Sequence, residues 1–250
     1  MSANEKEVTL KTQILMAGVL AAHLVSLTNT AGAHGIWLAQ RTDEMTVVYG
    51  HLAEDGAYET KKVKSVEGFT ATGEKRAITL APSEKNVKLT APDDVVVLST
   101  VFDNGFWIKG PDGKWQNVGK QQVAGGTESH QPLKYNTHIL KSPGTALKPT
   151  GAPLEIVPLT DPIALKLGDD LPVQVYLNGK PLAGASVIND YINNAEAVTK
   201  ADADGKATLK VTSAGLNVIG VEFTEKTPTN ADVDEIFNFA TLSYTLPHVE

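Results

Sequence analysis

Short runs of apolar and β-branched residues, separated by turn signals about every 8 to 15 residues, constrain the fold of this chain more than any other feature. Runs of this kind favour β-strands, and a regular spacing of turns is typical of β-sandwiches. Helical periodicity is weak beyond the first 30 or so residues. We therefore predict an all-β fold, with strands near residues 45–49, 95–102, 171–177, 207–212, 216–223 and 239–246.

Two turns in the second half have distinct chemistry. Asn178-Gly179 follows an alternating run and predicts a type I′ hairpin turn. The segment Asp202-Ala-Asp-Gly205 resembles half of a calcium-binding loop, but a closing Glu is missing at the required distance. A hairpin turn is the favoured interpretation of that segment.

A stretch rich in Pro and Gly, residues 142–165, predicts a junction between two domains. We expect two β-sandwich domains, with residues 34–160 forming an N-terminal β-rich metal-binding domain. Residues 161–250 are expected to form an Ig-like β-sandwich.

The N-terminus indicates export from the cytoplasm. An apolar run over residues 14–27 ends in Ala31-Gly-Ala33, a small-residue pattern typical of signal peptide cleavage. The alternative is a buried N-terminal helix of a cytosolic protein. We predict that residues 1–33 are a signal peptide, and that the mature protein begins at His34 in a Gram-negative periplasm. No later segment is long and apolar enough to span a membrane, so the mature protein is expected to be soluble.

Composition narrows the chemistry available to the protein. The net charge of −7 argues against nucleic-acid binding, which needs a concentrated basic surface. The chain contains no cysteine, which excludes thiolate metal sites and cysteine nucleophiles. After removal of the signal peptide, Met45 is the only methionine, so a multi-methionine Cu(I) site is excluded.

The histidines are the remaining strong metal donors. As the first mature residue, His34 would present both a free α-amine and an imidazole, which together chelate one metal ion. The alternative is that a histidine follows the cleavage site by chance. His51 comes at the end of the first expected strand and can face the same end of the fold, although an exposed turn histidine is the simpler local interpretation.

Two further histidines are candidate ligands in the metal-binding domain. His130 and His138 are separated by an even number of residues, so they would share one face of a straight strand. Pro132 makes an uninterrupted strand doubtful, and Gly125-Gly126 suggests a loop just before it. Amine and imidazole donors suit Ni(II) and Co(II), and also Cu(II) and Zn(II).

No catalytic constellation is visible, and we expect the protein not to be an enzyme. The chain lacks G-x-S-x-G, H-E-x-x-H, a P-loop and a dinucleotide-binding fingerprint. Trp37, Trp107 and Trp115 suit either a sugar-binding platform or ordinary packing, since the last two flank a Gly-Pro-Asp-Gly turn.

The chain resembles the DUF4198 family. The resemblance is carried by His34-Gly-Ile-Trp-Leu38, by Tyr-Gly-His51, by Leu-Lys-Tyr135 and by segments of the second half such as Asn178-Gly-Lys-Pro-Leu-Ala-Gly-Ala185. Members of that family include proteins described as periplasmic components of nickel or cobalt uptake systems. The resemblance implies a nickel- or cobalt-binding protein that delivers metal to a membrane transporter, with His34 and His51 as ligands.

Two other functions are compatible with the same residues. A copper ion held by an N-terminal histidine and a second histidine would make the protein an oxidative enzyme acting on polysaccharides. Alternatively, the Ig-like half would act as an envelope carbohydrate-binding or adhesion module, which predicts no stoichiometric metal.

Overall fold

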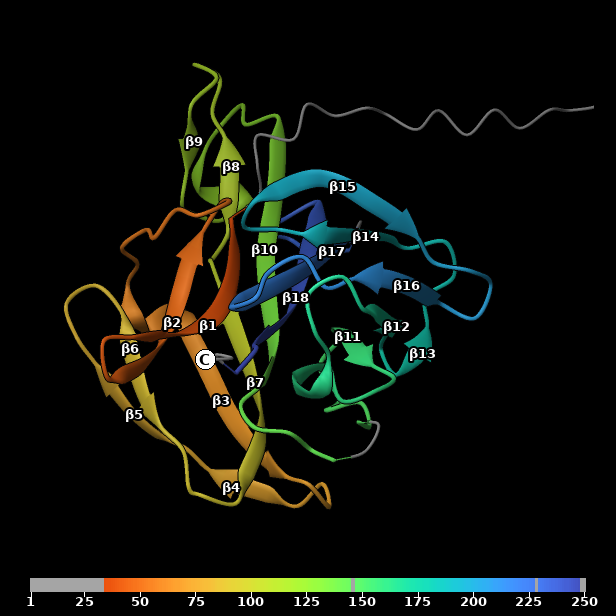
Figure 1. The fold of residues 1–250 in the computed structure, drawn as a ribbon. Helices are drawn as coiled ribbons and strands as arrows, with labels where there is room; N and C mark the ends of the chain where they lie inside the picture. The colour runs from red at the N-terminus through yellow and green to blue at the C-terminus, as the bar shows by residue number, and fades with distance from the viewer. Residues whose placement is uncertain (1–33, 145–146, 228, 248–250) are drawn as a thin grey trace, which may run out of the picture. The chain divides into compact units, whose positions relative to one another are not determined.

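The computed structural model describes residues 34–144, 147–227 and 229–247 (Figure 1). The predicted signal peptide and His248 lie outside the described residues. Strands dominate this part of the chain, and its three helical segments are single 3₁₀ turns at Thr60–Lys62, Lys120–Gln122 and Pro162–Ala164. The all-β expectation is confirmed, and each of the predicted runs overlaps a strand. None of the helical segments in the described ranges is long and apolar enough to cross a membrane.

The strands form three sheets, which we call the first, central and third sheets. The first sheet has the order β1 (Gly35–Arg41), β2 (Glu44–Gly50), β6 (Val87–Thr90), β5 (Thr79–Pro82). In the third sheet, β11 (Leu154–Pro158) pairs with one side of β12 (Asp170–Leu177), and β13 (Lys180–Pro181) and β16 (Lys206–Lys210) pair with the other side.

The central sheet has ten strands. Its main path is β15 (Asn194–Lys200), β14 (Ser186–Asp190), β17 (Leu216–Lys226), β18 (Glu235–Thr245), β10 (Glu128–Ile139), β7 (Val95–Asp103), β3 (Val63–Thr70), β4 (Lys75–Ala77). The short strands β8 (Trp107–Lys109) and β9 (Trp115–Gln116) extend the ladder beside one end of β10. Figure 1 shows β10, β17 and β18 running side by side through the middle of the described fold.

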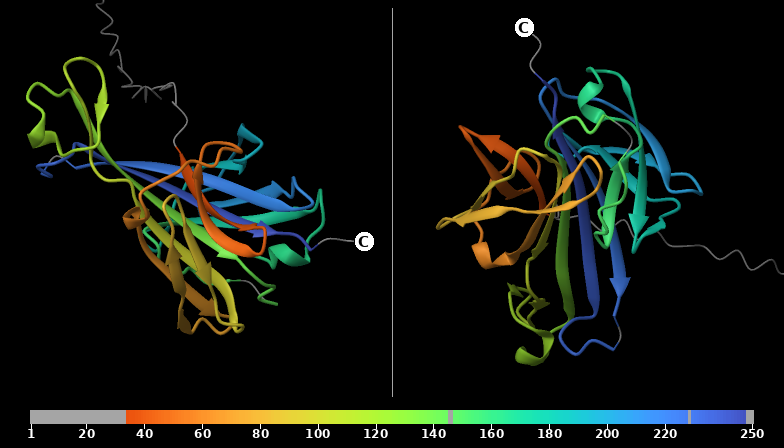
Figure 2. Two further views of the ribbon diagram at one scale, coloured as in Figure 1. Left: turned by 90° about the vertical axis from the view of Figure 1, so that its left-hand side faces the viewer. Right: turned by 90° about the horizontal axis from the view of Figure 1, so that it is seen from below.

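The first and third sheets cover opposite faces of the central sheet. Along β18, Ala240 and Leu242 belong to the cluster that packs against the third sheet. The intervening Thr241 points the other way and donates a hydrogen bond to the carbonyl of Ile36 in β1. Because side chains alternate across a strand, these contacts fix the two faces. The right-hand view in Figure 2, seen from below, shows the same arrangement, with the long strands between the first and third sheets.

The predicted junction at residues 142–165 links β10 to β11. The strands before and after it share the central sheet, because β10 and β18 pair in parallel with Tyr135 opposite Ala240. A parallel pairing between distant segments has no short-range sequence signal. The division into residues 34–160 and 161–250, and the Ig-like character of the second segment, stay predictions that limited proteolysis can test.

Local turn chemistry follows the sequence closely. Asn178 and Gly179 have φ values of 50° and 73° and connect β12 to β13, as a type I′ turn requires. The Asp202–Gly205 segment is also a turn, in which the Asp202 carboxylate accepts hydrogen bonds from the backbone N–H groups of Asp204 and Lys206. It is not a hairpin, however, because it passes from β15 in the central sheet to β16 in the third.

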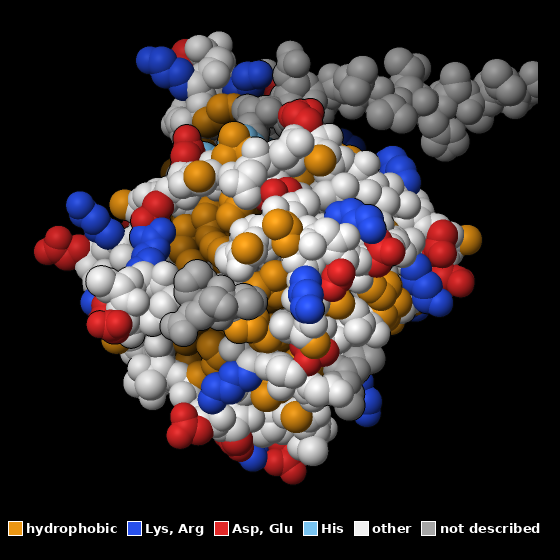
Figure 3. All heavy atoms as spheres, viewed as in Figure 1, with side chains coloured by type: hydrophobic (Ala, Val, Ile, Leu, Met, Phe, Trp, Pro, Cys, Tyr) orange, Lys and Arg blue, Asp and Glu red, His pale blue; other side chains and the backbone are white. Residues whose placement is uncertain are grey.

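The charged groups are dispersed on the face shown in Figure 3. Acidic and basic side chains alternate there, and no basic patch forms over that face.

Candidate metal site

His34 and His51 meet at the open end of the β1–β2 hairpin. The antiparallel register pairs Gly35 with Gly50, so the next residues outward, His34 and His51, lie at the same end of the hairpin. The His34 ring stacks on Tyr49, with 4.9 Å between centroids and an interplanar angle of 14°. The structure therefore brings together the two ligands predicted from both ends of the hairpin.

Tyr191 holds this end of the hairpin in place. The Gly35 N–H donates to the Tyr191 hydroxyl at 2.8 Å, and that hydroxyl donates to the Gly50 carbonyl at 3.0 Å. Its ring lies edge-on to His51, with 5.9 Å between centroids. Tyr191 is 1% exposed and follows β14, so the second half of the chain fixes the geometry of the candidate ligands.

Both glycines at this end are required by close packing. A Cβ atom at Gly35 would come within 2.9 Å of the Phe239 and Tyr191 rings. At Gly50 it would come within 2.1 Å of the Glu54 carbonyl oxygen. Larger residues at either position would push the hairpin end away from its support.

The imidazole of His51 has an unsatisfied nitrogen. Its Nδ1 atom is buried and makes no hydrogen bond within the described residues. A buried polar atom without a partner costs roughly 1–3 kcal/mol, so it is an unusual feature unless a ligand supplies the partner. Glu54 lies close by, because its N–H donates to the His51 carbonyl, and its carboxylate is 3.6 Å from His34 Nε2.

A buried lysine supplies the positive charge near the site. Lys134 on β10 is 2% exposed, and its ammonium group lies 5.9 Å from the Tyr49 ring centroid and 6.0 Å from that of Phe239. No ion pair neutralises it within the part of the chain that the structure describes. Burial, with a smaller contribution from Lys62, lowers the pKa of Lys134 to about 7.

The electrostatic environment favours the neutral form of the His34 imidazole. Partial burial lowers the pKa of His34, and the charges of Lys134 and His51 lower it further, whereas Glu54 acts in the opposite direction. A neutral imidazole is the form that coordinates a metal ion. The His34 side chain is 42% exposed, so an ion in solution can reach it.

His130 and His138 do not join His34 and His51. β10 is one continuous strand, and Pro132 is accommodated where the partner of β10 changes from β8 to β7. The two histidines are eight positions apart along this strand, which corresponds to a distance of roughly 26 Å. His130 packs on Trp115 with 4.6 Å between ring centroids, and His138 is buried with its Nδ1 at 2.9 Å from Ser243 Oγ.

The side-chain donors at the hairpin end fall short of a complete metal site by themselves. Within the described residues, no group of three or more His, Cys, Asp or Glu side chains is arranged to hold a metal ion. A site built on His34 and His51 therefore depends on a further donor, and the α-amine of a mature His34 is one that side-chain geometry does not include.

Sequence reasoning did not single out Tyr191 or Lys134. Lys134 lies between Leu133 and Tyr135 in an alternating strand, a pattern that normally indicates a solvent-facing lysine. The three tryptophans do not form a common platform, because Trp37 is buried in the core at 4% exposure whereas Trp115 is 41% exposed.

The comparisons with known proteins identify relatives but no activity. The profile of the family described as "Domain of unknown function (DUF4198)" matches residues 31–225. An "Uncharacterized protein" from Haemophilus influenzae is 30% identical over 208 residues, covering 82% of this chain and 87% of that protein. No solved structure matches the chain. By the extent of the profile match, the chain belongs to the DUF4198 family.

Proposed function

We propose that the mature protein begins at His34 in the periplasm and binds Ni(II) or Co(II), which it delivers to a membrane uptake transporter. The ligands are the α-amine and imidazole of His34 together with the imidazole of His51. One observation carries the proposal: the buried Nδ1 of His51, which has no hydrogen bond among the described residues, lies at the hairpin end that also carries His34.

The donor types support a borderline metal ion. Imidazole and amine nitrogens suit Ni(II), Co(II), Cu(II) and Zn(II), whereas harder ions prefer sets of oxygen ligands. The Gly35 N–H already donates a hydrogen bond to Tyr191. The α-amine and the two imidazoles are then the nitrogen ligands that this end offers to a metal ion. Metal choice among these ions then depends on supply in the compartment, because intrinsic affinity follows the Irving–Williams order.

The surroundings favour reversible binding, as a delivery protein requires. His34 is partly exposed, so a receiving site can approach the ion without unfolding the protein. The positive charge of Lys134 repels a bound cation. Because the pKa of Lys134 is about 7, part of the Lys134 population is uncharged at neutral pH, which weakens this repulsion.

Titration calorimetry with Ni(II) tests the proposal on protein purified from periplasm, after its N-terminal residue has been established by intact mass. We expect one ion per chain for protein that begins at His34. Adding one residue before His34 removes the amine while keeping the imidazole, and should weaken binding as much as His34→Ala. His51→Ala should weaken it as well.

The chain offers a matched control. His130→Ala removes an imidazole that is remote from the hairpin end, so this variant should bind Ni(II) like the wild type. The proposal is wrong if the extended protein and His51→Ala both retain wild-type affinity, or if the mature protein starts at another residue.

The copper-enzyme alternative uses the same donors and needs its own test. An oxidative enzyme would consume a reductant and peroxide in the presence of chitin or cellulose. We propose a binding role and expect no such turnover from the copper-loaded protein. Tight Cu(II) binding alone would not decide between the functions, because most nitrogen sites prefer Cu(II).

A further inference from the structure

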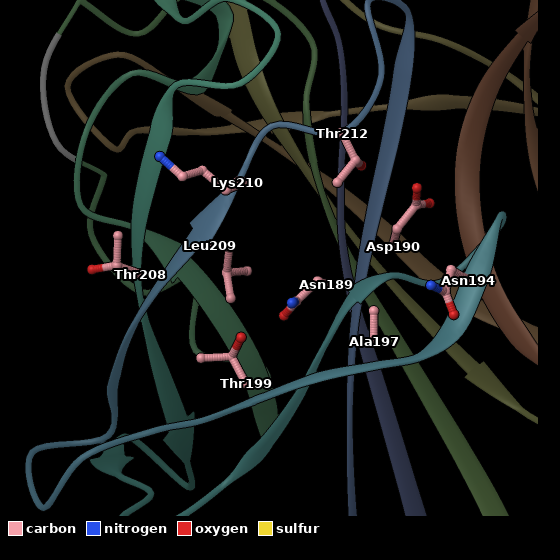
Figure 4. Close-up of a pocket in the computed structure, with 9 residues that line it drawn as sticks. All are labelled: Asn189, Asp190, Asn194, Ala197, Thr199, Thr208, Leu209, Lys210 and Thr212. Atoms are coloured by element: carbon pink, nitrogen blue, oxygen red, sulfur yellow. The ribbon is translucent and has the colours of Figure 1, made fainter.

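A polar hollow opens between the edges of two sheets, in the second half of the chain. It has a volume of about 240 Å³ and lies between β14–β15 of the central sheet and β16 of the third (Figure 4). Among the described strands, β15 forms an edge of the central sheet and β16 forms an edge of the third. The hollow is formed by different residues from those at the candidate metal site.

Asn189 is turned into this hollow by an irregularity in its strand. The β14–β15 register shifts between Ile188 and Asp190, which leaves Asn189 at a β-bulge. Bulges redirect side chains and are common beside binding sites. In Figure 4 the Asn189 amide lies among the lining residues, between those of β15 and those of β16.

The Asn189 amide oxygen has no hydrogen-bond partner among the described residues. Its Oδ1 atom is buried without a hydrogen bond, and the amide makes no other hydrogen bond to the described residues. An asparagine amide has two donors and an acceptor, and burying it unpaired costs roughly 1–3 kcal/mol. A polar group kept in that state at a bulge indicates a ligand with complementary donors and acceptors.

The charged residues of the lining are already paired within the protein. The Asp190 carboxylate accepts hydrogen bonds from Asn193 at 2.9 and 3.1 Å, and the Lys210 ammonium lies 2.7 Å from Asp170. The Lys210 charge is thus balanced by Asp170, and the Asp190 carboxylate is hydrogen-bonded to a protein amide. The other polar lining groups are Asn194, Thr199, Thr208 and Thr212, which are uncharged.

We propose that this hollow binds a neutral ligand with adjacent hydroxyl groups, such as one sugar unit or a small polyol. One hydroxyl donates to Asn189 Oδ1 and its neighbour accepts from Nδ2, which satisfies both ends of the amide. The lining contains no aromatic residue, and its amide and hydroxyl groups can exchange hydrogen bonds with a hydroxylated ligand. The proposal is independent of metal binding.

Solution NMR on the ¹⁵N-labelled protein tests this site with glucose, galactose, mannose and glycerol, and with gluconate as a charged comparison. At least one neutral probe should shift the Asn189 side-chain amide resonances, which are identified by their loss in Asn189→Leu. Gluconate should shift them far less. Asn189→Leu should abolish the perturbation of the neighbouring backbone amides.

Two comparisons keep the result interpretable. Glu196→Gln changes a side chain on the opposite face of β15 and should bind the probes like the wild type. Asn189→Leu should fold with unchanged or greater stability, because it removes a buried amide oxygen that lacks a hydrogen bond. The proposal fails if no neutral probe shifts the Asn189 amide at millimolar concentration, or if Asn189→Leu binds as well as the wild type.

Discussion

The backbone N–H of Gly35 donates a hydrogen bond to the hydroxyl of Tyr191, a residue 156 positions away. The same hydroxyl donates to Gly50, so one side chain joins the two strand ends that carry His34 and His51. Tyr191→Phe leaves the Gly35 N–H and the Gly50 carbonyl without this partner. We expect a loss of roughly 2–4 kcal/mol in unfolding free energy, measured by urea denaturation, and weaker Ni(II) binding.

Tyr58 provides a matched control for that prediction. Its hydroxyl also joins two strands, donating to the Val47 carbonyl and accepting from the Val87 N–H at 2.8 and 2.9 Å. Tyr58→Phe should lose similar stability, yet keep wild-type Ni(II) affinity. Equal affinity in both variants would show that Tyr191 supports the fold without positioning the ligands.

The sequence predicted the parts of this structure that local patterns determine. Alternating runs predicted the strands. Asn178-Gly179 predicted a type I′ turn, because both residues readily adopt the positive φ that this turn requires. The pairing of His34 with His51 was also foreseeable, because a short hairpin brings residues near its two ends together.

Features that depend on distant segments were not predictable in this way. The central sheet joins β10 to β18 in parallel, and this buries Lys134 although its neighbours suggest exposure. Tyr191 looks like an ordinary aromatic residue in a turn, and only the packing of β1 against the second half gives its hydroxyl a role. The bulge at Asn189 depends on a register shift with no evident sequence signal.

Lys134 should make the protein less stable at neutral pH than at alkaline pH. Its pKa falls from the ordinary 10.5 in the unfolded chain to about 7 in the folded protein, so stability is lost as pH falls from 10.5 toward 7. Lys134→Met should raise the unfolding free energy at pH 7 by on the order of 4 kcal/mol. That gain should shrink by about 3 kcal/mol at pH 9.5, as checked by urea denaturation at both values. An equal gain at both pH values would contradict a titration of Lys134.

His138 should make the unfolding free energy depend on pH in the acidic range. Complete burial lowers the pKa of His138 to about 4, from the ordinary 6.5. Stability is then fully present above pH 6.5 and is lost as pH falls from 6.5 toward 4. Between pH 7 and pH 4.5 the wild type should lose about 2 kcal/mol more unfolding free energy than His138→Gln, since other titrating groups are shared. Equal losses of unfolding free energy in the two proteins would show that a group other than His138 causes the pH dependence.

Glu54 should affect metal binding in two ways that a pH series separates. Its carboxylate lies 3.6 Å from His34 Nε2, where it attracts a cation but also raises the pKa of His34. In Glu54→Gln, Ni(II) affinity at pH 8 should fall a few-fold, because proton competition is small there and the attraction is lost. The pH at which Ni(II) affinity falls to half of each variant's own pH 8 value should move downward, because the His34 pKa falls without the carboxylate. Glu59→Gln is the matched control, since Glu59 pairs with Lys61 at 2.6 Å and has no role at the hairpin end. Calorimetry between pH 5.5 and pH 8 measures both effects, and a Glu54→Gln titration that overlays the wild-type series would remove Glu54 from the site.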